Sequence, residues 1–151
     1  MNKFMEEAIK EGRKGIIKGH GGPFGAVIVK DGKIIAKGHN MVVKKKNCTL
    51  HGEMVAIQRA CRKLKSFDLS GTELYSTAEP CPMCLGAIMW ANIKKVYIGC
   101  LKSDVDKIGF RDEVFHKLMN EGKGVDMEVA DREDCLKLFE EYKNLKDKTS
   151  Y

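Results

Sequence analysis

Two short motifs contain residues that bind metals or move protons. One is His51-Gly52-Glu53, and the other is Pro80-Cys81-Pro82-Met83-Cys84, with 29 residues between His51 and Cys81. A Cys-x-x-Cys pair at the start of a helix lets both sulfurs converge on one point, and the positive helix terminus favours their thiolate form. Zinc binds thiolates and imidazole, and a site with three protein ligands keeps a fourth position open for water. We therefore predict one zinc ion held by His51, Cys81 and Cys84, with Glu53 close enough to reach the water.

Other interpretations of the cysteines remain open. A Cys-x-x-Cys motif in a cytosolic α/β protein is often a redox pair, although that role would not require His51 and Glu53. A purely structural zinc site needs a fourth protein ligand, and the residues that would supply it have no paired spacing: Cys48, Cys61, Cys100, Cys135, His20, His39 and His116. Packing as small hydrophobic side chains accounts more simply for the four remaining cysteines.

The complete pattern, His-x-Glu followed by Pro-Cys-x-x-Cys, is the signature of zinc deaminases that act on nucleobases. In that chemistry Glu53 takes a proton from the attacking water, returns it to a ring nitrogen and assists the departure of ammonia. A non-catalytic zinc-binding interaction domain is the alternative from a different class. The intact Glu53 argues against it, because a structural site has no use for that carboxylate.

The composition limits the class of protein. A chain of 151 residues fits one domain, residues 1–151, and six cysteines are too sparse for a disulfide scaffold. The apolar runs are far shorter than the ~20 residues that span a bilayer, and the N-terminus has no signal-peptide pattern. We therefore expect a cytoplasmic protein with reduced cysteines and no membrane partner. The net charge of +6 includes one dense basic run, Lys44-Lys45-Lys46, with no aromatic residue in it. This does not favour nucleic acid as a partner, but leaves it as an alternative.

Hydrophobic spacing and turn residues predict the elements. A β-hairpin is expected around Asp31-Gly32, with strands over 24–30 and 33–38. Apolar residues at helical spacing favour helices over 4–17, 52–64, 83–91, in short pieces within 110–119, and from Asp131 to about Lys146. Further strands are expected over 72–76, 94–99 and 125–130, and a loop is expected over residues 40–50. Helices that alternate with strands indicate an α/β fold, a three-layer α/β/α sandwich with a mixed central sheet of about five strands.

Three stretches carry a resemblance to a known family. They are residues 22–32 (GPFGAVIVKDG), residues 79–91 (EPCPMCLGAIMWA) and residues 109–112 (GFRD). The chain resembles the cytidine deaminase-like superfamily along nearly its whole length, and within it the bacterial guanine deaminases most closely. The resemblance implies conversion of guanine to xanthine and ammonia, a step of purine metabolism, through attack at C2 of the base.

The resemblance also implies which residues contact the substrate. Asn40 would hydrogen-bond the base edge, and Gly52 would offer its backbone N–H. Asp112 would accept hydrogen bonds from the guanine amino group and N1–H and take part in proton transfer. Phe24 and Trp90 would wall the flat base. Plainer alternatives are a turn asparagine, a helix-capping aspartate and aromatic side chains that simply pack in the core.

The C-terminal residue, Tyr151, resembles the terminal tyrosine of that family. There it belongs to a segment that reaches the partner subunit's site in a swapped dimer, so the resemblance implies a homodimer with C-terminal segment swapping. The last helix would then pack across or near the interface. A frayed tail is the alternative, since chain termini are often disordered.

A second family shares the zinc motif, the tRNA adenosine deaminases. They usually differ from this chain between Cys81 and Met83, at Trp90-Ala91 and at residues 109–112. The chain also departs from the guanine deaminases: Gly52 replaces an alanine, Arg111 an aspartate, and Ala78 a common cysteine. These departures concern substrate identity more than chemistry. Deamination of cytosine, of guanosine or of tRNA adenosine therefore remains an alternative.

Overall fold

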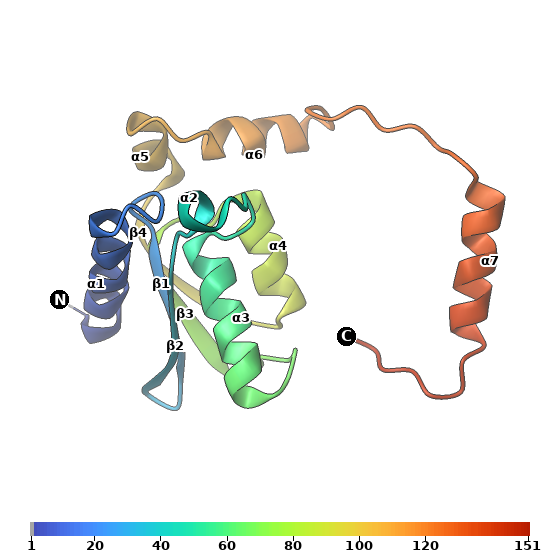
Figure 1. Ribbon diagram of the computed structural model, residues 1–151, viewed down its shortest axis with the longest axis horizontal. Helices are drawn as coiled ribbons and strands as arrows, with labels where there is room; N and C mark the ends of the chain where they lie inside the picture. The colour runs from blue at the N-terminus through green and yellow to red at the C-terminus, as the bar shows by residue number, and fades with distance from the viewer. Residues whose placement is uncertain (1) are drawn as a thin grey trace.

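The computed structural model describes residues 2–151 (Figure 1). Helices and strands alternate after an initial hairpin, in agreement with the expected α/β class. In chain order the elements are α1 (Lys3–Ile17), β1 (Gly25–Lys30), β2 (Lys33–His39), α2 (Val42–Lys45), α3 (Gly52–Leu64), β3 (Thr72–Ala78), α4 (Pro82–Trp90), β4 (Lys95–Cys100), α5 (Lys102–Lys107), α6 (Asp112–Asn120) and α7 (Arg132–Lys143).

Within residues 2–151 the strands form one mixed sheet of four, in the order β2-β1-β3-β4. Strand β1 is antiparallel to β2 and to β3, whereas β3 and β4 are parallel. The hairpin turn is Asp31-Gly32, with φ of 49° and 71°, a conformation that Asp and Gly tolerate. The predicted hairpin is confirmed, and strands β3 and β4 lie within two residues of their predicted ends.

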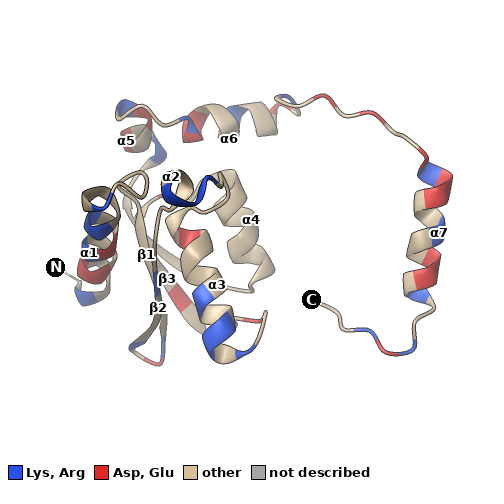
Figure 2. Ribbon diagram, viewed as in Figure 1, with Lys and Arg blue, Asp and Glu red and all other residues tan. Residues whose placement is uncertain are grey.

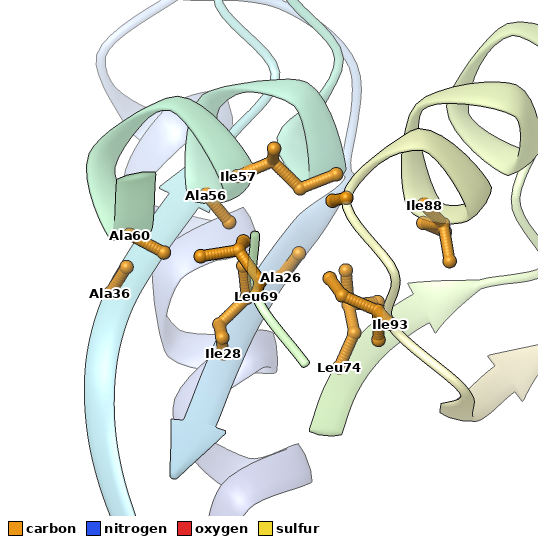
Figure 3. Close-up of a cluster of buried hydrophobic side chains, with 11 residues drawn as sticks. Ala26, Ile28, Ala36, Ala56, Ile57, Ala60, Leu69, Leu74, Ile88 and Ile93 are labelled. Atoms are coloured by element: carbon orange, nitrogen blue, oxygen red, sulfur yellow. The ribbon is translucent and has the colours of Figure 1, made fainter. Parts of the chain in front are cut away.

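Helices pack on both faces of the sheet (Figure 1). Helices α3 and α4 cover one face over a cluster of buried aliphatic side chains (Figure 3). Its members include Ile28 and Leu74 from the strands and Ala56 and Ile88 from the helices. On the other face, α1 packs through Ala8 against Val27, Val29 and Tyr75. These two cores fix α3 and α4 on the same side of β1 and β3.

Close backbone approach explains glycines that propensity alone would disfavour. At Gly12 of α1, a Cβ would lie 3.1 Å from the backbone nitrogen of Gly25. At Gly38 of β2, a Cβ would lie 2.5 Å from both Ala56 N and Gly52 O. The glycines therefore let α1 lie directly on β1, and let the first turns of α3 lie directly on β2.

Several sequence-based expectations differ from the structure. The expected loop 40–50 contains the short helix α2, and residues 125–130 lie outside any strand of the described chain. The chain beyond α6 leads away from the sheet, so these residues have no neighbouring strand with which to pair (Figure 1). The expected fifth strand is therefore not confirmed. Helix α1 contacts β1, β2 and β3, while β4 remains largely exposed, so the third layer is incomplete.

Candidate metal centre and substrate cavity

The two motifs lie at the starts of adjacent helices. His51 is the N-cap residue of α3 and Cys81 is the N-cap residue of α4, both with extended backbone. Pro82 occupies the first position of α4, where its missing N–H removes no helix hydrogen bond. Instead of capping their own helices, the two side chains meet: Cys81 Sγ lies 3.5 Å from His51 Nδ1.

Cys84, in the first turn of α4, completes a cluster of three donors. One ligand atom each from His51, Cys81 and Cys84 lies within 4.8 Å of the others. Both thiols are buried and the imidazole is half-buried. Two thiolates and one imidazole match zinc in softness, and three protein ligands leave a position open. The donor set therefore fits the zinc ion predicted from the spacing.

The thiols are held in unequal charge states. The hydrogen bond from Cys84, and after it that from His51, outweigh burial and lower the pKa of Cys81 to about 4. The same contact raises the pKa of Cys84, together with burial and the nearby Glu53. The hydrogen bond with Cys81 in turn raises the pKa of His51. The positive ends of the two helices stabilise negative charge on the thiolates, and that negative charge attracts a metal cation.

Glu53 is buried two residues after His51. Its carboxylate accepts hydrogen bonds from Ser76 Oγ at 3.1 Å and from the Cys84 thiol at 3.6 Å. Burial raises the pKa of Glu53, so its carboxyl holds a proton more readily than an exposed one would. A carboxyl whose pKa is raised in this way is suited to accept and return a proton.

Ser76 was not among the site residues predicted from the sequence. It lies on β3 two residues after Leu74, and therefore on the same face of the sheet, toward α3 and α4. A polar residue at an apolar position of a buried strand was the available signal. Only the fold shows that its hydroxyl meets Glu53.

A cavity of about 660 Å³ opens at this end of the two helices. Six of the ten predicted site residues line it: Phe24, Asn40, His51, Glu53, Cys81 and Asp112. Cys84 is buried behind them, next to Glu53. The cavity brings together residues from α2, α3, α4 and α6, which are distant in the sequence.

Asn40 is buried directly after β2, and its orientation is defined. The side-chain Oδ1 of Asn40 accepts the backbone N–H of Val42 at 3.0 Å. The backbone N–H of Asn40 donates to the Phe24 carbonyl at 2.9 Å. With Oδ1 engaged, the side-chain NH₂ group is the part left to meet a ligand. Asn40 therefore presents hydrogen-bond donors.

Asp112 begins α6 on the opposite side of the cavity. Burial, and next the charge of Cys81, raise the pKa of its half-buried carboxyl. Beside it the Arg111 guanidinium lies 4.8 Å from the Phe115 ring centroid, so it stacks on that ring. Asp112 is therefore an acceptor group close to the metal donors.

Phe24 and Phe110 form an aromatic corner of the cavity. Their ring centroids are 4.8 Å apart, at an interplanar angle of 79°. Phe110 was part of the quoted 109–112 motif but was not predicted as a site residue. Phe110 follows Gly109 in an irregular segment, so residue spacing could not show that its ring contacts Phe24.

Besides Cys84, three predicted site residues of the described chain lie outside the cavity lining: Gly52, Trp90 and Tyr151. Gly52 packs behind it, where a Cβ would lie 3.1 Å from the Phe24 carbonyl oxygen. The Trp90 and Tyr151 rings lie 5.8 Å apart at the end of α4, with side chains 67 % and 78 % exposed. The carboxyl-terminal segment thus returns to the surface of its own chain near α4 (Figure 1).

Basic side chains are spread over several elements (Figure 2). One group lies on α2, at Lys44 and Lys45, and another at the end of α3, at Arg62 and Lys63. Helices α1 and α7 carry both signs of charge (Figure 2). No helix in the described residues is long and apolar enough to cross a membrane.

With the site in place, comparison with known proteins identifies its class. Residues 1–100 match the model of the cytidine and deoxycytidylate deaminase zinc-binding region. The chain belongs to this family of zinc-binding deaminases. That membership agrees with the predicted superfamily and with the His-Cys-Cys cluster.

Among its relatives, guanine deaminase from Bacillus subtilis is 38 % identical over 151 residues, covering 98 % of this chain and 97 % of that protein. The X-ray structure of guanine deaminase from that organism superposes with a TM-score of 0.93, over 100 % of this chain and 99 % of the other. A tRNA-specific adenosine deaminase from Aquifex aeolicus is 46 % identical over 98 residues, which are 65 % of this chain and 64 % of that protein.

Proposed function

We propose that residues 1–151 form a single zinc-dependent deaminase domain that converts guanine and water to xanthine and ammonia. One observation carries the choice of guanine. The similarity to Bacillus subtilis guanine deaminase extends over the whole chain, including the C-terminal third that the family model does not reach. That third contributes Asp112 to the cavity.

The metal donors His51, Cys81 and Cys84 would hold one zinc ion per subunit. When bound, zinc activates water as a nucleophile at neutral pH. The chain holds Glu53 beside this cluster, since its carboxylate contacts Cys84. Glu53 takes a proton from the attacking water, passes it to N3 of the base, and then assists departure of the C2 amino group as ammonia.

The polar groups of the cavity complement guanine on two sides. The NH₂ group of Asn40 donates to an acceptor on the base edge, and Asp112 accepts from N1–H and the amino group. Gly52, at the first position of α3, has a backbone N–H without a partner in its own helix, and this N–H is the group that would donate to the base. Phe24 walls one face of the flat base.

We further propose a homodimer in which the C-terminal segments are exchanged. In residues 125–130, Val125, Met127 and Val129 alternate with polar residues and are 76 %, 87 % and 83 % exposed. Alternation of this kind is typical of a strand that buries one face. Strand β4 is the exposed edge of the sheet and has backbone groups free to pair on that side. Pairing of 125–130 with β4 of a second copy would supply the fifth strand.

Helix α7 would complete the third layer in the same dimer. Its apolar residues recur at helical spacing and are at least half exposed: Leu138, Phe139 and Tyr142. An apolar groove of about 290 Å³, lined by Ile9, Ile16 and Gly99, lies between α1 and β4. A helix from a second copy would cover this uncovered face. The match over the full chain to the Bacillus subtilis structure supports the extended placement of α7. Exchange would also bring Tyr151 and Trp90 to the interface.

All six cysteines of the described chain are free thiols, as a reducing compartment would keep them. We therefore place the enzyme in the cytoplasm, in purine metabolism.

Ammonia release from a panel of substrates tests the proposal directly. Zinc-loaded protein is given guanine, guanosine, cytosine, adenine and a tRNA anticodon stem-loop, with metal content measured on the same sample. We expect turnover of guanine and about one zinc per chain. Ammonia release from another base, with none from guanine, would show that guanine is not the substrate. The proposed zinc-dependent deamination would still hold.

A second candidate is deamination of tRNA adenosine. The identity of 46 % to the Aquifex aeolicus enzyme favours it, as does the basic helix α2, whose Val42 and Val43 line the cavity. Activity on the stem-loop that falls steeply with salt would support this candidate, because phosphate contacts release counterions.

A further inference from the structure

Outside the cavity, three titratable side chains form a continuous hydrogen-bonded chain. His39 Nδ1 lies 2.7 Å from Glu11 Oε1, and His39 Nε2 lies 2.8 Å from His20 Nδ1. Glu11 and His39 are 7 % and 3 % exposed, and the two imidazole rings stack with centroids 5.1 Å apart. We call Glu11, His39 and His20 the imidazole chain. None of its members takes part in the proposed chemistry.

The charge of Glu11 assigns the donors and acceptors along the imidazole chain. Burial alone would raise the pKa of Glu11, but the hydrogen bond from His39 and the charge of Lys14 outweigh it, so the pKa lies below its usual value. The ionised carboxylate therefore accepts from His39 Nδ1–H. His39 Nε2 is then left to accept from His20 Nδ1–H. Burial lowers the pKa of His20, and the neighbouring His39 and lysines lower it further, so the His20 ring is neutral more readily than a free imidazole.

The backbone of His20 ties the same chain to the helix beside the cavity. Its carbonyl accepts the N–H groups of Val43 and Lys44, both at 3.1 Å, and its own N–H donates to the Gly15 carbonyl at 2.9 Å. Gly15 leaves space for His39, since a Cβ there would lie 2.8 Å from the His39 ring. Helix α1, the end of β2 and the start of α2 are thus joined through two histidines.

One end of this arrangement, Asn40 and α2, forms part of the wall of the substrate cavity. His39 directly precedes Asn40, and α2 contributes Val42 and Val43. The Asn40 carboxamide is oriented by the N–H of Val42, so a shift of α2 would turn the group that is to meet the base. Precise placement of such a group depends on the residues that support it.

We propose that His39 and His20, anchored on Glu11, are positioning residues that hold Asn40 and α2 in the orientation needed to bind the substrate. This inference rests on the proposed function, because Asn40 matters only if the cavity takes a base. The imidazole chain lies away from the metal donors and Glu53. It therefore affects the binding of the base and leaves the chemical step unchanged.

Replacing His39 separates binding from chemistry. H39L removes both hydrogen bonds, and we expect KM for guanine to rise about tenfold or more while kcat changes less than about threefold. H39Q restores an N–H for Glu11 and a carbonyl for His20, and should bring KM back to within about threefold of wild type. H20A removes only the outer, partly exposed member and should raise KM by an intermediate factor. K10M is the control, because Lys10 is an exposed lysine of the same helix that pairs with Glu6 and Glu7 and not with a member of the imidazole chain.

A second readout does not depend on activity. Amide hydrogen exchange in residues 40–48 should be faster in H39L and H20A than in wild type and H39Q, while exchange in α4 stays unchanged. The proposal would be overturned if folded, zinc-loaded H39L and H20A had the same KM and the same exchange rates as wild type. A loss of kcat at constant KM would also overturn it. If H39L fails to fold, the KM values and exchange rates of H20A and H39Q still test the positioning role. If wild-type protein does not act on guanine, the proposed function fails while the exchange rates still test the positioning role.

Discussion

At the scale of single residues, the carboxylate of Glu53 is held from two directions. Ser76 Oγ donates to Oε1 and the Cys84 thiol to Oε2. Both partners come from elements that also build the core, β3 and α4. The orientation of Glu53 is therefore set by the fold before any substrate enters.

Glu53→Gln tests the proton carrier. The amide has nearly the same shape and no ligand to the metal is lost, so zinc content should stay at the wild-type level. Because an amide cannot carry the proton, kcat should fall at least ~100-fold. Steady-state ammonia release and metal analysis check the two parts. Near-normal turnover in zinc-loaded E53Q would place the proton transfer elsewhere.

Ser76→Ala tests the support of that carboxylate. The variant leaves Glu53 Oε1 without its donor, and a hydrogen bond to a charged group contributes about 1.5–3 kcal/mol. We expect kcat to fall about tenfold or more with little change in KM. S70A is the matched control, since Ser70 is exposed in the loop before β3. Equal kcat in S76A and S70A would contradict a role for this hydroxyl.

Spacing was enough to find the metal donors, because the residue types and helix starts can be read locally. It was not enough for Ser76 and Phe110, since each meets its partner only through contacts distant in sequence. Asn40, Asp112 and Phe24 came from resemblance, and the structure places all three at the cavity. Trp90 and Tyr151 also came from resemblance, and the structure places their rings side by side at the end of α4, outside the cavity lining.

At the scale of elements, the site depends on how closely α3 lies on β2. The contact is at Gly38, where a Cβ would lie 2.5 Å from backbone atoms of α3. Backbone atoms cannot move aside as the end of a flexible side chain does. Any larger residue must therefore displace the helix start that carries His51 and Glu53.

Gly38→Ala should consequently affect stability and metal together. We expect the free energy of unfolding to fall by roughly 1–3 kcal/mol, the usual cost of overpacking, and zinc content to fall with it. Denaturant unfolding and metal analysis are the measurements. Q58A, on the exposed side of the same helix, should change neither quantity. Full zinc occupancy in G38A would show that α3 can shift without disturbing the donors.

The contact between α1 and β2 has an acid-sensitive part. Hydrogen bonds from Lys10, and next from Lys37 of β2, lower the pKa of Glu7 from 4.5 to about 2. A carboxyl whose folded pKa is lowered stabilises the fold above its unfolded pKa, and loses this contribution as pH falls through the folded pKa. E7Q should therefore have a slightly lower Tm than wild type at neutral pH, and the difference should shrink as pH falls from 4.5 to about 2.

Thermal unfolding of both proteins from neutral to acid pH checks this trend. E6Q is the control, because Glu6 contacts Lys10 within α1 and does not reach β2. A Tm difference that stays constant down to the lowest pH would contradict the role of Glu7.

Most elements were predictable because local patterns determine them. Asp31-Gly32 specified the hairpin, and apolar spacing specified α1, α3 and α4. Residues 125–130 have the pattern of a strand, but a strand forms only beside a neighbour, and pairing is a property of the whole assembly. Helix α2 was missed because four residues are too few to show a period.

At the scale of the whole molecule, the proposed dimer explains why a chain would expose its last apolar residues. Phe139 is 67 % exposed here, so a charge at this position costs an isolated chain little. In an exchanged dimer the same residue would be buried. F139D should therefore reduce the mass in light scattering from that of a dimer to that of a monomer at micromolar concentration.

Lys137→Asp is the matched control, since it places the same side chain on the opposite side of α7 and should leave the dimer intact. A wild-type monomer, or a dimer that F139D does not affect, would contradict the exchange. Loss of the dimer without loss of folded structure is the expected result.

The two helix starts that carry the metal donors and the aspartate proposed to bind substrate belong to different stretches of the chain. Residues 1–100, the part common to the family model, contain His51, Glu53, Cys81 and Cys84. Asp112 and its neighbour Arg111 come later, on and before α6. The metal donors and Glu53 therefore lie entirely within the family region, whereas one proposed substrate contact, Asp112, lies beyond it. A change confined to the later stretch can alter which base is bound and leave the hydrolytic residues as they are.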